Sequence, residues 1–187
     1  MTEPNQKTTH HNPSQVETID MLFKVINRFD FYTNSTNVKT SLIIAWNSFI
    51  FGTILMKYDD ILTLFPPIGW PHYISIFFVS LFGIFSIISN IFAFQVALPF
   101  LQPSSINLSS SSMFFFGSVS KKSVEDYSVE IGGASFEFIL SDLCDQAVTV
   151  ARGLSEKMAK LQNSIQAIYG GLIAASGLLI LKAIVSV

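Results

Sequence analysis

Three long runs of apolar residues, at residues 40–58, 73–100 and 164–187, dominate the pattern of the chain. A helix needs roughly 20 residues to cross a bilayer core of about 30 Å, and each run comes close to that length or exceeds it. The second run is long enough that we expect it to tilt or to protrude. No charged residue lies in the central part of any run. The pattern predicts an all-α membrane protein with three transmembrane helices.

The segments between the runs differ in character. Residues 59–72 are short and rich in proline, and they predict a tight turn outside the membrane, because proline interrupts a continuing helix. Trp70 in this turn is typical of the membrane interface. Residues 101–163 are polar enough to fold outside the bilayer.

The distribution of lysine and arginine predicts the orientation, because short loops rich in these residues stay in the cytoplasm. Nine of them precede the first span or lie in residues 101–163, namely Lys7, Lys24, Arg28, Lys39, Lys121, Lys122, Arg152, Lys157 and Lys160. The proline-rich turn is bordered only by Lys57. We therefore expect the N-terminus and the central segment in the cytoplasm, and the turn and the C-terminus outside.

The polar segments predict a small helical module on the cytoplasmic side. Residues 1–13 are polar and are expected to be disordered. An amphipathic helix is expected at residues 14–39, because Ser14 and Glu17 have the spacing of a capping box and apolar residues follow at helical spacing. The polar run Asn34–Asn37 is either a hinge or a weak part of one long helix.

Residues 101–163 supply the rest of this module. After a serine-rich linker, "MFFFGSV" predicts a short extended piece or a packing plug, and Ser123 begins a helix that Gly132 and Gly133 end. From Ala134 apolar residues recur three and four positions apart, which predicts one long amphipathic helix that runs into the third span. So small a core is marginal alone, so we expect it to depend on the membrane helices and on other copies of the chain.

Composition agrees with a membrane protein. Hydrophobic residues make up 50% of the chain, charged residues 13%, and the mean hydropathy is +0.49. The net charge of −2 gives no indication of a nucleic-acid partner, which would show as a basic face. The single cysteine, Cys144, excludes an intrachain disulfide and a cysteine metal cluster, and is expected to be a small buried apolar residue.

Motifs of common catalytic sites are absent from the sequence: there is no HExxH, GxSxG, Walker loop or GxGxxG. We therefore expect no enzyme, no catalytic residue and no metal or other cofactor. Asp142 and Asp145 lie three positions apart on a predicted helix, and such a pair can hold a metal. A solvated helix face is the favoured interpretation of this pair.

Polar and small residues inside the spans are candidates for assembly. Asn47, Asn90 and Gln95 are costly in contact with lipid, so they predict either hydrogen bonds between helices or the lining of a pore. Small residues four positions apart let membrane helices approach closely. In the third span they are Gly170, Gly171, Ala174, Ala175 and Gly177. They predict either packing between the spans of one chain or oligomerisation.

Two blocks of the sequence carry a family resemblance. In "RFDFYTNSTNVKTSLIIAWNSF", a polar stretch with a lysine leads into the first span, which contains an asparagine. In "FFFGSVSKKSVEDYSVEI" and the later "LSDLCDQAVTVARGLSEKMAKLQNSIQAIYGGL", a Phe-Gly-Ser element and a Ser-x-Glu-x-Tyr helix precede an Asp-Leu-x-x-Gln helix. From about Met21 to Leu181 the chain resembles the transmembrane effector of Pycsar, the pyrimidine cyclase system for antiphage resistance.

This resemblance implies a function. In such systems a neighbouring pyrimidine nucleotide cyclase makes cCMP or cUMP on infection, and the effector damages the inner membrane before the phage matures. Lys39, Asn47, Asp142 and Gln146 correspond to residues of the family pattern. The chain departs from that pattern at Asn37, where an aspartate is expected, so no carboxylate role is carried over to this position.

A cyclic mononucleotide carries one negative charge, so its pocket needs a cation or helix N-terminal amides. The candidate cations are Arg152, Lys39, Lys157 and Lys160, and Arg152 ranks first because it lies within an apolar pattern on the long helix. For Lys39 the favoured role is to mark the cytoplasmic edge of the first span. The alternative to a ligand-gated effector is a constitutive membrane scaffold or interaction protein.

Overall fold

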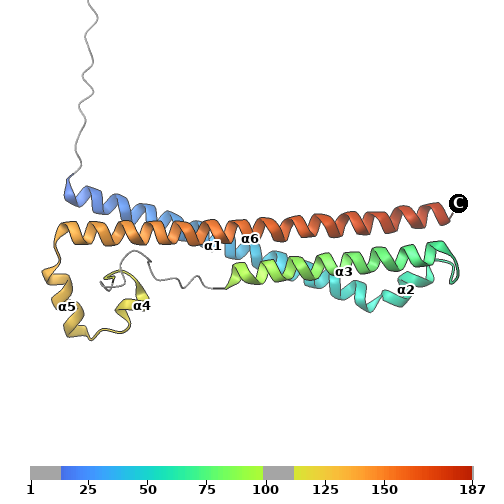
Figure 1. The fold of residues 1–187 in the computed structure, drawn as a ribbon, viewed down its shortest axis with the longest axis horizontal. Coiled ribbons are helices and arrows are strands. Elements are labelled where there is room, and N and C mark those ends of the chain that lie inside the picture. Colours follow the sequence, from blue (N-terminus) through green and yellow to red (C-terminus); the bar gives the residue numbers. More distant parts are fainter. Residues whose placement is uncertain (1–13, 99–111, 187) are drawn as a thin grey trace, which may run out of the picture. The chain divides into compact units, whose positions relative to one another are not determined.

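The computed structural model describes residues 14–98 and 112–186, and the regular elements in these ranges are helices (Figure 1). In chain order they are α1 (Gln15–Met56), α2 (Tyr58–Thr63), α3 (Trp70–Ala97), α4 (Phe116–Val119), α5 (Val124–Gly133) and α6 (Phe136–Val185). By length and composition α1, α3 and α6 can each cross a membrane. The predicted all-α fold with three membrane helices is thus confirmed. The predicted tail at residues 1–13 and most of the serine-rich linker lie outside the described residues.

The chain divides into two compact units. The first, which we call the helical module, comprises Met1–Asp30 and Gln102–Ala151. The second, which we call the span unit, comprises Phe31–Leu101 and Arg152–Val187. Helices α1 and α6 each contribute to both units, so α6 continues from the module into the third span without interruption, as its apolar pattern predicted.

Helix α1 begins at the predicted capping box. The Ser14 N–H donates to the Glu17 carboxylate at 2.7 Å, and the Glu17 N–H donates to Ser14 Oγ at 3.3 Å. The polar run in the middle of α1 is helical. There the Thr36 hydroxyl donates to the Tyr32 carbonyl and the Thr40 hydroxyl to the Thr36 carbonyl, each at 2.8 Å. Side-chain hydroxyls are thus satisfied within the helix, and α1 runs through this stretch as one helix.

The predicted turn at residues 59–72 contains more helix than expected. Helix α2 occupies Tyr58–Thr63, and α3 already begins at Trp70, so that Pro71 lies in its first turn. A proline is tolerated there because the N–H groups of a first helical turn have no partner within the helix. Gly69 precedes α3 with φ of 124°, a backbone conformation that residues other than glycine rarely adopt.

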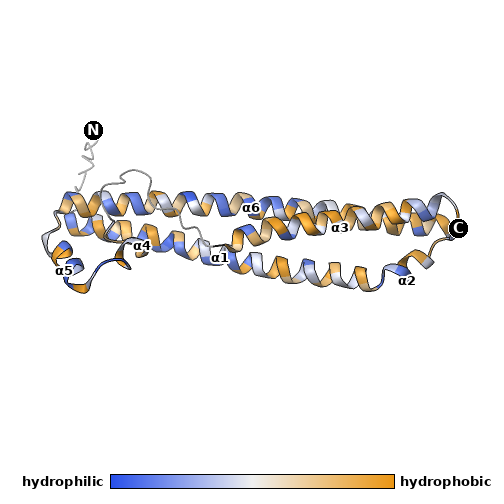
Figure 2. Ribbon diagram, turned by 60° about the horizontal axis from the view of Figure 1, so that its bottom comes forward, coloured by the Kyte–Doolittle hydropathy of each residue, from blue (hydrophilic) through white to orange (hydrophobic). Residues whose placement is uncertain are grey.

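The buried side of α3 is a narrow stripe. From Val79 to Val96 its buried residues alternate three and four positions apart, which is the spacing of helices that pack side by side. Apolar residues on the rest of α3, such as Phe77 and Ile84, are more than half exposed, as contact with lipid requires. Hydrophobic residues predominate along α3 and along the C-terminal half of α6, whereas polar residues are more frequent along the N-terminal half of α6 (Figure 2).

Candidate functional site

Within the helical module, two polar side chains of α6 hold the segment that precedes α4. The Asp142 carboxylate accepts the N–H of Met113 at 2.7 Å, and the Gln146 amide donates to Ser112 Oγ at 3.0 Å. Asp142 and Gln146 lie on one face of α6 because they are four positions apart, and both are buried. We call these contacts, with that of Tyr127 below, the loop clamp.

Helix α5 completes the loop clamp. Ser123 caps its start by accepting the N–H of Asp126 at 3.0 Å. One turn later the Tyr127 hydroxyl donates to the Met113 carbonyl at 3.0 Å. Buried backbone groups in an irregular segment need such partners, and both backbone groups of Met113 find them on side chains. The Met113 side chain is 2% exposed, so it is the packing plug of "MFFFGSV", whereas Phe116 in the same stretch is 64% exposed.

Two expectations for this part of α6 were wrong. Asp142 is not on a solvated face. It is 9% exposed, because the segment that precedes α4 covers it and the Met113 N–H of that segment donates to its carboxylate. Cys144 is exposed, because Leu143 beside it occupies the buried position. In the described ranges no group of three or more His, Cys, Asp or Glu residues is placed to hold a metal ion.

Lys157 is the buried cation of the span unit. It lies on α6 before the predicted third span at residues 164–187, and its ammonium donates to the Val96 carbonyl at 2.7 Å and to Asn37 Oδ1 at 3.0 Å. Val96 belongs to the last turn of α3, where carbonyls lack partners within the helix and the helix dipole favours a cation. Burial, together with repulsion from Lys160, lowers the pKa of Lys157.

The apolar spacing of α6 favours Met158, beside Lys157, for the packed face, so the buried position of Lys157 was not predicted. Met158 is 49% exposed and Lys157 is 7% exposed. The available signal was spacing, since Lys157 lies three positions after buried Leu154 and seven before buried Ser164. At Asn37, where the family pattern leads one to expect an aspartate, the carboxamide oxygen serves as the acceptor.

The other candidate cations lie elsewhere. Arg152 and Lys39 are exposed, and Lys160 is half-buried. Lys39 lies on α1, and Arg152 and Lys160 lie on α6. Their role in binding a ligand stays a prediction.

The polar residues inside the spans have different environments. Asn47 is buried, and its amide donates to the Ser86 carbonyl at 2.9 Å, so it joins α1 to α3. The Ser89 and Ser164 hydroxyls lie 3.0 Å apart and join α3 to α6, a contact that no sequence motif indicated. Asn90 is half-buried, and its Oδ1 is enclosed without a partner among the described residues, whereas Gln95 is exposed.

The small residues of the third span make room for phenylalanine rings of α3. A Cβ atom added to Gly170 would lie 2.7 Å from the Phe85 ring, and one added to Gly177 would lie 2.5 Å from the Phe78 ring. Among the neighbouring small residues, Gly171 and Ala174 are buried and Ala175 is half-buried. This is packing within one chain, the first of the two alternatives, and oligomerisation through these residues stays a prediction.

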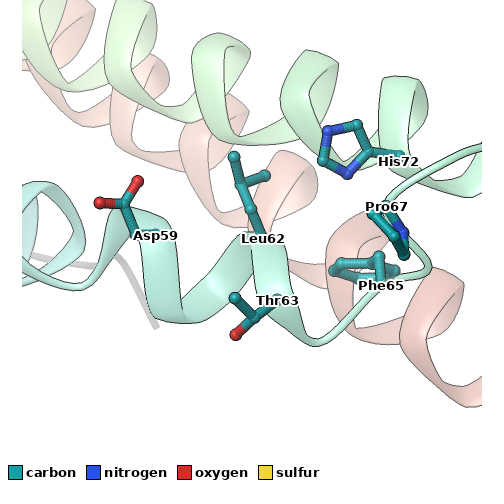
Figure 3. A pocket seen from close by; sticks show the side chains of 6 residues that line it. All are labelled: Asp59, Leu62, Thr63, Phe65, Pro67 and His72. Atoms are coloured by element: carbon teal, nitrogen blue, oxygen red, sulfur yellow. The ribbon is translucent and has the colours of Figure 1, made fainter.

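A hollow of about 360 Å³ lies where α2 meets the start of α3 (Figure 3). It is lined mainly by apolar atoms of Asp59, Leu62, Thr63, Phe65, Pro67 and His72. Close to it, the Lys182 ammonium donates to the Leu64 carbonyl at 2.7 Å. None of the candidate ligand-binding cations lines this hollow.

The three long apolar helices define the class as a membrane protein, and it carries a helical module. The chain belongs to the family of the Pycsar effector protein domain, whose model matches residues 21–184. No match was found among curated proteins or among solved structures. The family confirms the resemblance and makes the protein an effector of antiphage defence rather than the cyclase of the system.

Proposed function

We propose that this effector responds to cCMP or cUMP, the product of a separate pyrimidine nucleotide cyclase, by impairing the integrity of the inner membrane. The infected cell then dies before the phage matures. The observation that carries the proposal is the continuity of α6 over Phe136–Val185. One helix bears the loop-clamp residues Asp142 and Gln146 and also forms the third span, so a rotation or shift in the module changes the membrane part.

Ligand binding biases such a helix only if the nucleotide has different affinities for the resting and active arrangements. Arg152 is the first candidate for the phosphate group because it lies within the apolar pattern of the long helix, and it is exposed there on α6. A guanidinium fits a phosphate through paired hydrogen bonds. Lys39 and Lys160 are the further candidates, whereas the ammonium of Lys157, which the sequence also offered, is already bonded to Val96 and Asn37.

We also propose a homo-oligomer in the inner membrane, with the N-terminus in the cytoplasm and the C-terminus outside. Exposed apolar side chains on α5 of the small module, such as Val124 and Val129, favour contact with further copies. A reporter that is active only in the cytoplasm tests the orientation when fused after Val187. Reporter activity at this position would exclude the proposed orientation.

The function is tested with the purified full chain in liposomes loaded with a fluorescent dye. We expect dye release on addition of cCMP or cUMP and none with cAMP. Arg152→Ala should weaken the response, whereas Lys121→Ala, which changes an exposed lysine outside the candidate set, should not. No release with either pyrimidine nucleotide would defeat the proposed gating and favour the constitutive scaffold, which also predicts no toxicity on overexpression.

A further inference from the structure

Lys157 joins the three long helices of the span unit at the C-terminal end of α3. Its ammonium, on α6, bonds the Val96 carbonyl on α3 and Asn37 Oδ1 on α1. The surroundings are enclosed: the side chains of Val96 and of Thr40, which lies one turn beyond Asn37 on α1, are 0% exposed. The contact is therefore an internal tie between helices rather than a surface interaction.

This tie behaves differently from apolar packing. A buried cation is costly unless hydrogen-bond acceptors surround it, and a carbonyl in the last turn of a helix needs a donor from outside the helix. If the end of α3 moves away from α6, the Val96 carbonyl loses its donor and Lys157 keeps Asn37 as its acceptor. The tie therefore favours two discrete arrangements, one engaged and one released, over a continuous range.

We infer that Lys157 is a positioning residue that holds α1, α3 and α6 in the resting arrangement, and that release of Val96 and Asn37 accompanies damage to the membrane. The inference rests on the proposed function, because that function supplies a resting and an active state. It assigns to Lys157 a role in setting the threshold of activation, which is separate from binding the nucleotide.

Asn37 allows the tie to be adjusted in both directions. Its neutral carboxamide is a weaker acceptor for an ammonium than a carboxylate of the same size. Asn37→Asp therefore strengthens the tie, whereas Lys157→Met removes it and keeps the length of the side chain. Asn37→Leu is a milder release variant, because it leaves Lys157 its bond to Val96. Opposite shifts from these variants are an outcome that simple loss of folding does not produce.

The control is Lys182→Met. Lys182 is another lysine of α6 whose ammonium donates to a backbone carbonyl, that of Leu64, at 2.7 Å. The substitution is the same and the bond again joins an ammonium to a backbone carbonyl, but this bond is exposed and lies near the C-terminal end of α6. This control separates loss of the particular tie at Val96 from a general loosening of the helices.

Dye release from liposomes is measured for each full-length variant, first without nucleotide and then in a titration with cCMP and with cUMP. We expect Lys157→Met to release dye without nucleotide about tenfold faster than the wild type, and Asn37→Leu less strongly, as a tie that sets the balance of two states implies. Asn37→Asp should raise the nucleotide concentration for half-maximal release about threefold or more. Lys182→Met should match the wild type.

The inference would be overturned if Lys157→Met released dye without nucleotide at the wild-type rate and still responded to nucleotide. Equal basal release from Lys157→Met and Lys182→Met would overturn it as well, by showing general loosening. If Lys157→Met is not recovered as folded protein, basal release from Asn37→Leu decides in the same way. If the wild type ignores both nucleotides while Lys157→Met still releases dye, the proposed ligand fails and the role of Lys157 stands.

Discussion

Replacing Gly170 by alanine tests how closely α6 packs against α3. The added Cβ would lie 2.7 Å from the Phe85 ring, and the same change at Gly177 would place a Cβ 2.5 Å from the Phe78 ring. Carbon atoms in contact prefer separations of about 3.5–4.0 Å, so ring and helix have to separate by about 1 Å. Both rings are half-buried, and a ring that moves that far loses part of its contact with α6.

The size of the effect follows from two opposing contributions. Overpacking by one methyl group costs about 1–3 kcal/mol, and alanine in place of glycine inside a helix regains about 1 kcal/mol. We therefore expect Gly170→Ala and Gly177→Ala to lower the free energy of unfolding by up to about 2 kcal/mol. At Gly52 nothing lies within 4 Å of the added atom, and at Gly171 the closest atom is 3.6 Å away, on Phe82. Both of these changes should be neutral or stabilising.

The assay is equilibrium unfolding of the purified protein in mixed micelles, followed by circular dichroism. Because the four variants share one substitution, differences among them report the space around each glycine. If Gly170→Ala is as stable as Gly52→Ala, α6 does not approach Phe85 as closely as described. If these glycines instead serve contacts between copies, Gly170→Ala will reduce cross-linked oligomers and leave the stability of the single chain unchanged.

Two further predictions concern polar contacts. Asp142→Ala leaves the Met113 N–H without its acceptor, which should destabilise the module by about 1–3 kcal/mol. Hydrogen exchange of the backbone amides of α5 and α6 measures this loss. Exchange as slow as in the wild type would show that the loop clamp does not stabilise the module. Asn47→Leu removes the bond to the Ser86 carbonyl, and hydrogen bonds between membrane helices average about 0.6 kcal/mol. Unfolding in micelles should show a small loss of that size, and a loss several times larger would mean that Asn47 has partners beyond Ser86.

Local and periodic features were predictable from the sequence. The three apolar runs, the capping box at Ser14, the helix start at Ser123 and the long α6 depend on neighbouring residues or on helical spacing, and the structure contains each of them. The small residues of the third span were predicted as packing positions, and Gly170 and Gly177 lie against phenylalanine rings of α3. That the Phe78 and Phe85 rings of α3 are their neighbours could be seen only in the structure.

The environments of the polar side chains were decided by tertiary structure alone. Asp142 looked like part of a solvated face because its partner, Met113, is 29 positions away in the sequence. Lys157 looked like one of several free cations because its partner Asn37 is 120 positions away. Hydropathy treats a charged residue as exposed, whereas burial of a charge depends on whether distant acceptors meet it. Helices and spans are therefore set by the order of the residues, while the loop clamp and the tie at Lys157 arise only when separate helices come together.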